Sequence, residues 1–202
     1  VVGAGHADWL LLPVDGGRRA LLPRAGVRVD TRGGHGGLDA AGIGDVTVSG
    51  WAVGRLVLEG APARLAAVAG AALTAAVVGS AEGVWRKHVE QVRARLATSY
   101  GGEEVSDDAF AQVSWAASDI DAAKLQVAAS LELPDGPAAH WAHQQAVARA
   151  RGAADRLLSS SNHALDGSDP VTRRWRDVQA GCRLAVPLLH GLQAVGAGDY
   201  RS

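Results

Sequence analysis

The 202-residue chain is long enough to bury a hydrophobic core in one or two domains. Its 20 Lys and Arg residues against 21 Asp and Glu leave a formal net charge of −1, which argues against a nucleic-acid or anionic-membrane partner. Cys182 is the only cysteine, which excludes an internal disulfide and a cysteine-based zinc site. The apolar run 65–78 is short and Ala-rich, and it predicts a buried helix rather than a membrane span. We therefore expect a cytoplasmic protein.

The sequence changes character near Gly60, which divides it into residues 1–60 and 61–202. The first part is rich in glycine, and Asp15-Gly16 between two apolar runs predicts a β-hairpin. The strands that we expect are Trp9–Val14, Arg19–Leu22, Val27–Val29, Val46–Val48 and Arg55–Leu58. Five short strands make a poor independent domain, so this part is expected to be a partial β-domain. Its N-terminus looks cut, because the chain has no Met and begins directly in strand-like sequence.

From Pro62 onward, apolar residues recur with a helical period. We expect a very long first helix that ends at Gly101-Gly102, and then a second helix from the N-cap Ser106 to Leu131. A third helix is expected over 138–160, and a fourth begins after the cap Asp169 with proline at its first position. Pro187 should kink the fourth helix. Four long helices with short connections predict a mostly α protein, an antiparallel four-helix bundle preceded by the small β-region.

Individual residues of the helices also suggest roles. The tryptophans, one per helix, are expected in the bundle core or in a subunit interface: Trp85, Trp115, Trp141 and Trp175. Cys182 falls on the apolar stripe of the fourth helix and is expected to be an inert core residue. Asp177 follows Arg173 by four residues, the spacing of an ion pair on a helix surface. His140 and His143 have no matching carboxylate or cysteine, so we expect no metal site there.

Four segments, taken in chain order, resemble one protein family. Gly5–Leu11 (GHADWLL) is similar to an "ADW" strand, and Gly37–Val46 (GLDAAGIGDV) to a "G-L-R-G-T-G-S" turn and the strand that follows it. Tyr100-Gly101-Gly102, after Arg93 and Arg95, resembles the end of the family's first bundle helix. Asp169–Val178 (DPVTRRWRDV) resembles the signature "P-L-x-R-x-W-R-D-V". These are features of the acyl-CoA dehydrogenase superfamily, and the last belongs to its flavin-dependent monooxygenase branch. The resemblance covers the end of the family's middle β-domain and its C-terminal helical domain, with no counterpart of the N-terminal domain.

The sequence departs from the family at several positions. In the turn motif, Asp39, Ala41 and Ile43 stand where Arg, Thr and Ser are usual. Ala97 stands where dehydrogenases often carry an Arg, and Leu184 where the monooxygenase branch usually carries a His. The resemblance thus implies a flavin site of which this chain carries only an eroded half.

The resemblance also implies where FAD or FMN would bind, if the flavin site is retained. The candidate cofactor-binding residues are Arg93, Arg95, Tyr100, Ser161, Asn162 and His163. Trp175 and Arg176 are the candidate substrate-binding residues, and no catalytic residue is assigned. Purely structural roles stay open for these residues. The arginines suit a helix C-terminus, where their charge complements the helix dipole, and residues 159–163 suit an ordinary helix end. The loop Gly33–Gly37 lacks the lysine of a phosphate-binding loop and is expected to be a hairpin connection.

Two classes of function remain. The first is a flavin-dependent oxidoreductase, a monooxygenase or a dehydrogenase, or a subunit of one that needs a partner or a missing N-terminal half. The second is a degenerate, non-catalytic subunit that serves as an assembly scaffold for an active paralogue. In both cases we expect a homo- or hetero-oligomer through the helical bundle, because open sheet edges and apolar faces must be covered. A complementary acyl-CoA-dehydrogenase-like chain is the expected partner in the hetero-oligomer.

Overall fold

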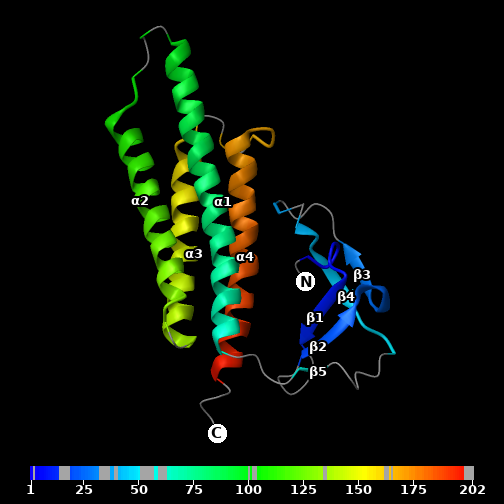
Figure 1. The fold of residues 1–202 in the computed structure, drawn as a ribbon. Coiled ribbons are helices and arrows are strands. Elements are labelled where there is room, and N and C mark those ends of the chain that lie inside the picture. Colours follow the sequence, from blue (N-terminus) through cyan, green and yellow to red (C-terminus); the bar gives the residue numbers. More distant parts are fainter. Residues whose placement is uncertain are drawn as a thin grey trace.

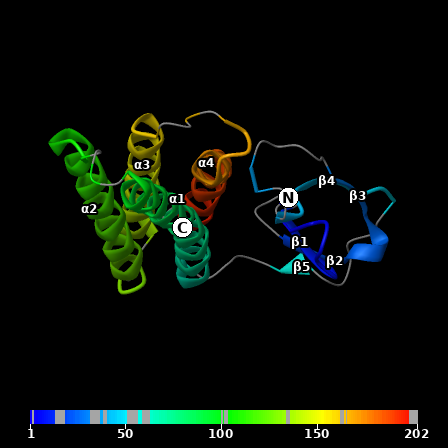
Figure 2. The same ribbon diagram turned by 90° about the horizontal axis from the view of Figure 1, so that it is seen from above.

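The computed structural model describes residues 1, 3–13, 19–31, 37–38, 41–50, 57–58, 63–99, 101, 104–133, 136–161, 164 and 166–197. These residues form four long helices and five short strands (Figure 1). The helices stand side by side, and the strands form a separate small β-region next to one side of the bundle. Seen from above, α4 is a helix on the side of the β-region and α2 lies on the far side (Figure 2). The mostly helical fold expected from the sequence is confirmed.

The β-region contains two small antiparallel sheets. Strand β1 (Trp9–Pro13) pairs with β2 (Arg19–Pro23), which also pairs with the short β5 (Val57–Leu58). Strand β3 (Arg28–Thr31) pairs with β4 (Gly44–Thr47). The two strands of the expected hairpin, β1 and β2, are confirmed within one residue at each end. The Asp15-Gly16 turn between them lies outside the described residues. Along β1 the side chains alternate, so that Leu10 and Leu12 are buried and Trp9 and Leu11 are exposed.

The helices are α1 (Ala63–Thr98), α2 (Asp107–Ser130), α3 (Gly136–Ser159) and α4 (Pro170–Ala197). Both predicted caps are present. Ser106 Oγ accepts a hydrogen bond from the Ala109 N–H at 3.2 Å, and Asp169 Oδ2 accepts one from the Thr172 N–H at 2.8 Å. Helix α3 begins two residues earlier than expected, because a proline in the first turn costs no intrahelical hydrogen bond. The structure thus has the four helices in the expected order.

The bundle core consists largely of alanine and valine. Its fully buried members come from every helix: Ala81, Val84, Ala116, Ala123, Ala150, Ala154, Leu157, Val171, Val178 and Ala185. Small side chains let the helix backbones approach one another, and α1 packs on α2, α3 and α4. Residues Ala67–Thr98 are apolar and long enough, by length and composition only, to cross a membrane, which the sequence analysis did not anticipate. Such a test is weak evidence, because core helices of bundles also pass it.

Several large apolar side chains in the helical part of the chain are nevertheless exposed. The exposed fractions are 47% for Val68, 68% for Phe110 and 51% for Leu131. A helical period tells which residues share a face, but not where the neighbouring helix ends. The tryptophans divide in the same way: Trp85 and Trp175 pack against the core, whereas Trp115 and Trp141 are exposed.

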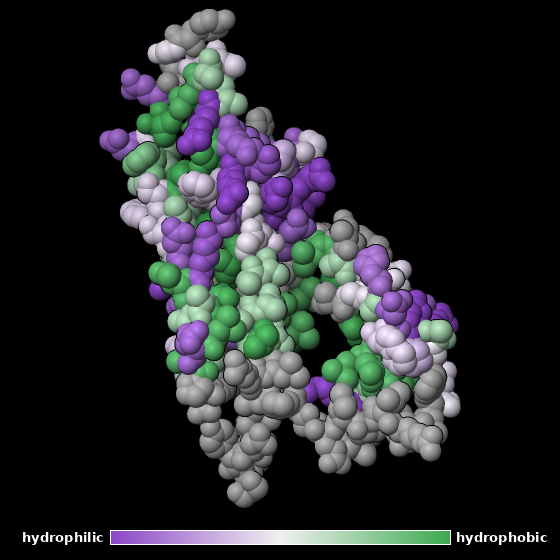
Figure 3. Space-filling model, viewed as in Figure 1, coloured by the Kyte–Doolittle hydropathy of each residue, from purple (hydrophilic) through white to green (hydrophobic). Residues whose placement is uncertain are grey.

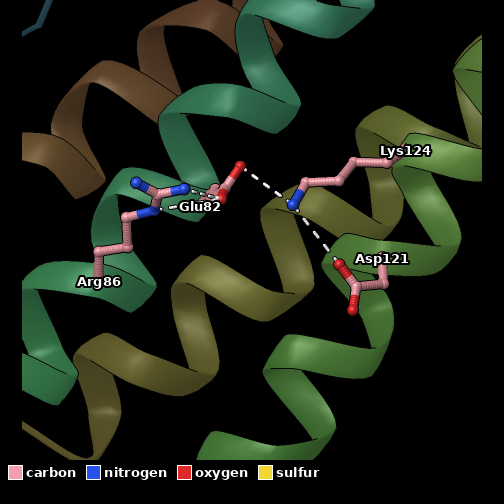
Figure 4. A network of polar contacts seen from close by, with 4 residues as sticks. All are labelled: Glu82, Arg86, Asp121 and Lys124. Carbon is pink, nitrogen blue, oxygen red and sulfur yellow. Dashed lines mark hydrogen bonds and ion pairs between the residues drawn. The ribbon is translucent and has the colours of Figure 1, made fainter.

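A network of charged side chains joins the first two helices (Figure 4). Glu82 on α1 accepts hydrogen bonds from Arg86 at 2.6 Å on the same helix and lies 3.0 Å from Lys124 Nζ on α2. Lys124 also lies 3.5 Å from Asp121. The hydrogen bond from Arg86, and then that from Lys124, lowers the pKa of Glu82. Because these side chains are partly exposed, each ion pair of the network contributes at most about 1 kcal/mol to stability.

Candidate functional site

The β-region contacts the bundle at the turn Gly37–Leu38, which lies against α4. The Leu38 N–H donates a hydrogen bond to Asp177 Oδ1 at 2.7 Å. A Cβ atom built on Gly37 would lie 2.3 Å from the Arg176 carbonyl oxygen, so only glycine fits there. Leu38 itself has a φ of 57°, in the left-handed region that is costly for a residue with a side chain. The structure therefore brings together the turn motif and the Trp-Arg-Asp motif, two segments that the sequence analysis had singled out separately.

This contact corrects the role expected for Asp177. The sequence analysis paired its carboxylate with Arg173, one turn earlier on the helix surface. In the structure the carboxylate instead accepts the hydrogen bond from Leu38, which is 139 residues away in the chain. Helical spacing predicts only local partners, and a segment from another part of the fold competes successfully for this carboxylate.

The space-filling view shows an opening between the bundle and the β-region, and the coloured residues beside it are mainly hydrophobic (Figure 3). An apolar cleft between two structural units is a common place for a small-molecule or cofactor site.

A second cavity, of about 500 Å³, lies at the end of the bundle where α1 ends and α2 begins. Two candidate cofactor residues from distant parts of the chain line it. Arg95 lies near the end of α1, and Ser161 follows the end of α3. Arg93 is not among its lining residues. Tyr100, Asn162 and His163 lie outside the described residues. The structure thus brings together Arg95 and Ser161 of the candidate set.

His88 lines the same cavity and is not among the candidate site residues of the sequence analysis. It is 5% exposed, and its Nδ1 atom has no hydrogen-bond partner in the described part of the chain. Burial, and then the charge of Arg95, lowers the pKa of His88, while Asp169 opposes this. The signal that could have drawn attention to it is an imidazole in the middle of an otherwise apolar stripe.

Asp169 stabilises the junction between α1 and the start of α4. Besides capping α4, it accepts a hydrogen bond from Gln91 Nε2 at 2.5 Å. Burial alone would raise the pKa of Asp169, but the hydrogen bonds from Thr172 and Gln91 hold it below its usual value. The carboxylate therefore stays charged close to the cavity.

The two candidate substrate residues, Trp175 and Arg176, point to different sides of α4. Trp175 Nε1 donates to Asp155 Oδ1 of α3 at 2.7 Å. The Arg176 guanidinium lies near the turn before α4, with its nitrogens 3.7 Å from a Cβ built on Gly167. Successive residues of a helix point about 100° apart, so this divergence follows from the helix geometry. Of these two residues, Arg176 is the one whose backbone contacts the turn at Gly37.

A third cavity, of about 760 Å³, opens between α3 and α4 and has Cys182 among its lining residues. Cys182 is 5% exposed, and burial raises the pKa of its thiol. A buried neutral thiol is unreactive, as expected from its place on the apolar stripe.

The remaining buried histidines make hydrogen bonds inside the bundle. His143 Nε2 lies 2.8 Å from Ser130 Oγ, and His140 Nε2 lies 2.8 Å from Gln144 Nε2. The Ser130 hydroxyl also lies within hydrogen-bond distance of the Val127 carbonyl oxygen, at 2.7 Å. Since this serine is fully buried in the bundle, the pair is structural rather than a nucleophile and its base.

Comparisons with known proteins agree with this picture. The profile of the family "Acyl-CoA dehydrogenase, C-terminal domain" matches residues 71–186. The chain is 38% identical, over 125 residues, to the flavin-dependent monooxygenase oxygenase subunit HsaA of Mycobacterium tuberculosis (strain H37Rv). Among solved structures, 3-HSA hydroxylase from Rhodococcus sp. RHA1 is 26% identical with a TM-score of 0.79. XiaF from Streptomyces sp., in complex with FADH2 and glycerol, shares the fold at 20% identity with a TM-score of 0.73.

The chain spans only part of each of these proteins. The alignment with HsaA takes in 54% of this chain and 32% of the relative. The structural similarity to the Rhodococcus hydroxylase covers 99% of this chain and 62% of the hydroxylase. The similarity to XiaF covers 95% of this chain and 61% of XiaF.

Proposed function

Because this chain belongs to the acyl-CoA dehydrogenase family, we propose that it works as part of a flavin-dependent oxidoreductase of the monooxygenase kind. The observation that carries the proposal is the contact between Gly37–Leu38 and Arg176–Asp177. It holds the β-region and the bundle on either side of a cleft, and the second of these segments resembles the monooxygenase branch. The similarity to HsaA supports the same choice.

The residues at the α1 end of the bundle fit the phosphate part of FAD or FMN. Arg95 supplies a guanidinium, Ser161 a hydroxyl group, and His88 a buried nitrogen without a partner in the described part of the chain. These are groups that hold phosphate through charge-assisted and neutral hydrogen bonds. A bound flavin would supply the redox chemistry, while the protein binds it, orients it and excludes water. Tyr100, Asn162, His163 and Arg93 remain proposed as further contacts.

The substrate is proposed to be largely apolar, because the visible walls of the opening beside α4 are mainly hydrophobic (Figure 3). Trp175 and Arg176 remain the proposed substrate-side residues. Of the two, Arg176 is better placed, since its backbone meets the turn of the β-region.

The working form is proposed to be a cytoplasmic oligomer assembled through the bundle. Large apolar side chains are exposed along α2 and α3, with exposed fractions of 57% for Trp115, 71% for Leu125 and 63% for Trp141. Exposed apolar side chains that gather on one face mark association surfaces. The partner is a second copy of this chain or a complementary chain of the same family.

A non-catalytic scaffold is the alternative, and two positions favour it. Ala97 is an exposed alanine where the family often has an arginine, and Leu184 is a leucine where the monooxygenase branch usually has a histidine. Losing one charge-assisted contact to phosphate weakens binding by roughly ten- to a hundredfold. We therefore expect the isolated chain to bind flavin poorly and to have no oxidoreductase activity by itself.

Titration of FAD and FMN, followed by flavin fluorescence, tests the proposal with the chain alone and with whatever chain its neighbouring gene encodes. Flavin binding in the mixture that Arg95→Ala weakens at least tenfold supports the proposed site. Arg149→Ala is the matched control, since it removes the same charge from an exposed position of α3 that does not line this cavity, and it should change the affinity by less than about threefold. A stable complex that binds no more flavin than the partner alone would favour the scaffold. A low-micromolar affinity of the isolated chain would show that its half-site is complete.

A further inference from the structure

The place where the β-region rests on the bundle is narrow. The strands pack on one another and the helices on one another, and no described strand is among the elements that pack closely on a helix. Between these two units, the hydrogen bond from the Leu38 N–H to Asp177 Oδ1 joins segments 139 residues apart. This contact involves a charged acceptor and is partly buried, which makes it stronger than a neutral hydrogen bond at the surface.

The fit around this hydrogen bond is tight on both sides. The Gly37 backbone lies against the Arg176 carbonyl, at a distance that leaves no room for a Cβ atom. The Leu38 side chain reaches over Gly181, and its Cδ1 lies 4.0 Å from the position that a Cβ there would take. Leu38 holds a left-handed backbone conformation, which costs energy unless its surroundings compensate. The contacts of the amide with Asp177 are one such compensation.

We propose that Asp177 is a positioning residue that latches the β-region onto α4. Its carboxylate holds the Leu38 amide, the close fit of Gly37 fixes the direction of approach, and together they set the width of the opening between the two units. Asp177 is proposed to act on the opening through its hydrogen bond with Leu38. The effect on flavin binding rests on the proposed function, whereas the latch does not.

Amide exchange of Leu38, measured by NMR on the full chain labelled with ¹⁵N-leucine, reports directly on the latch. Asp177→Ala removes the acceptor and should speed this exchange by roughly 10- to 100-fold. Asp177→Asn keeps an acceptor oxygen without its charge and should recover most of the protection. Gly37→Ala perturbs the same contact from the other side and should speed the exchange as well.

Two matched controls separate the latch from general destabilisation. Asp155→Ala removes a carboxylate that accepts hydrogen bonds of the same length between α3 and α4, from Trp175 and Gln179. Gly50→Ala places a side chain at another glycine with positive φ, where nothing lies within 4 Å. Both should leave the exchange of Leu38 relative to the other leucines unchanged. Circular dichroism checks that every variant keeps its helices.

The proposal is overturned if Asp177→Ala leaves the Leu38 amide protected, or if Asp155→Ala exposes it to the same extent. Flavin titration of the complex of chain and partner then gives a separate result. If Asp177→Ala weakens flavin binding and Asp177→Asn restores it, the latch positions the cleft. If the unaltered complex binds no flavin while exchange of Leu38 responds as expected, the proposed function fails and the latch stands.

Discussion

Replacing Gly70 by alanine should destabilise the bundle, although alanine is the better helix former. Gly70 lies in α1, where a Cβ atom would be 2.6 Å from Nδ1 and 2.8 Å from Cε1 of His143. The Leu189 Cδ2 atom would be 3.3 Å away on another side. The imidazole is 2% exposed and is hydrogen-bonded to Ser130, so it has little space into which to move.

The opposing contributions can be compared. Overpacking a tight core costs about 1–3 kcal/mol, and weakening the His143–Ser130 hydrogen bond adds about 1 kcal/mol. The gain in helix propensity from glycine to alanine is only about 1 kcal/mol. We therefore expect a net loss of about 1–3 kcal/mol in the free energy of unfolding, or about 2–4 °C in Tm for each kcal/mol.

Urea unfolding followed by far-UV circular dichroism measures this loss, and α1 supplies its own control. Gly79 lies in the same helix, is exposed, and has nothing within 4 Å of the position of a Cβ atom. Gly79→Ala should therefore stabilise the protein by about 0.5–1 kcal/mol, through helix propensity alone. If Gly70→Ala stabilises it to the same extent, His143 does not occupy the space that the structure assigns to it, and the reasoning is refuted.

Two further changes test other parts of the bundle. Burial is the main cause that lowers the pKa values of His88, His140 and His143 below 6.5, so the folded state favours the neutral imidazoles. Stability should be constant above about pH 6.5 and fall as the pH drops below it, because the unfolded chain takes up these protons first. Urea midpoints between pH 8 and 5 check this, and His143→Gln should reduce the slope. Asp169→Ala removes the cap of α4 and the hydrogen bond from Gln91, and thermal unfolding should show a loss of about 1–2 kcal/mol. A loss no larger than that from an exposed control, Asp108→Ala, would contradict this role.

The helices and their starts could be predicted from local sequence because their causes are local. A period of 3.6 residues marks α1 to α4, and the hydrogen bonds of Ser106 and Asp169 each reach only three residues along the chain. The hairpin strands β1 and β2 are also close in sequence, and their alternation places Leu10 and Leu12 in the small core. The position of a buried cysteine, Cys182, followed from the same periodicity.

The candidate site could be predicted only in part. Arg95 and Ser161 were both candidates implied by the family resemblance, and the structure places them at one cavity, where His88 joins them. The sequence does not distinguish Arg93 from Arg95 by residue type. Their different surroundings depend on which side of α1 meets the loops that follow α1 and α3, and those loops are distant in sequence.

By itself, the sequence determined what depends on neighbours along the chain: the helical periods, the caps, the β-hairpin and the resemblance of Asp169–Val178 to one family. Only the tertiary structure decided which apolar residues become core and which stay exposed, so that Trp85 is packed and Trp115 is not. It also decided that Asp177 holds Leu38 rather than Arg173. The physical reason is the same in each case. Burial and long-range hydrogen bonds depend on where a distant segment arrives, and that position is set by the packing of the whole bundle against the β-region.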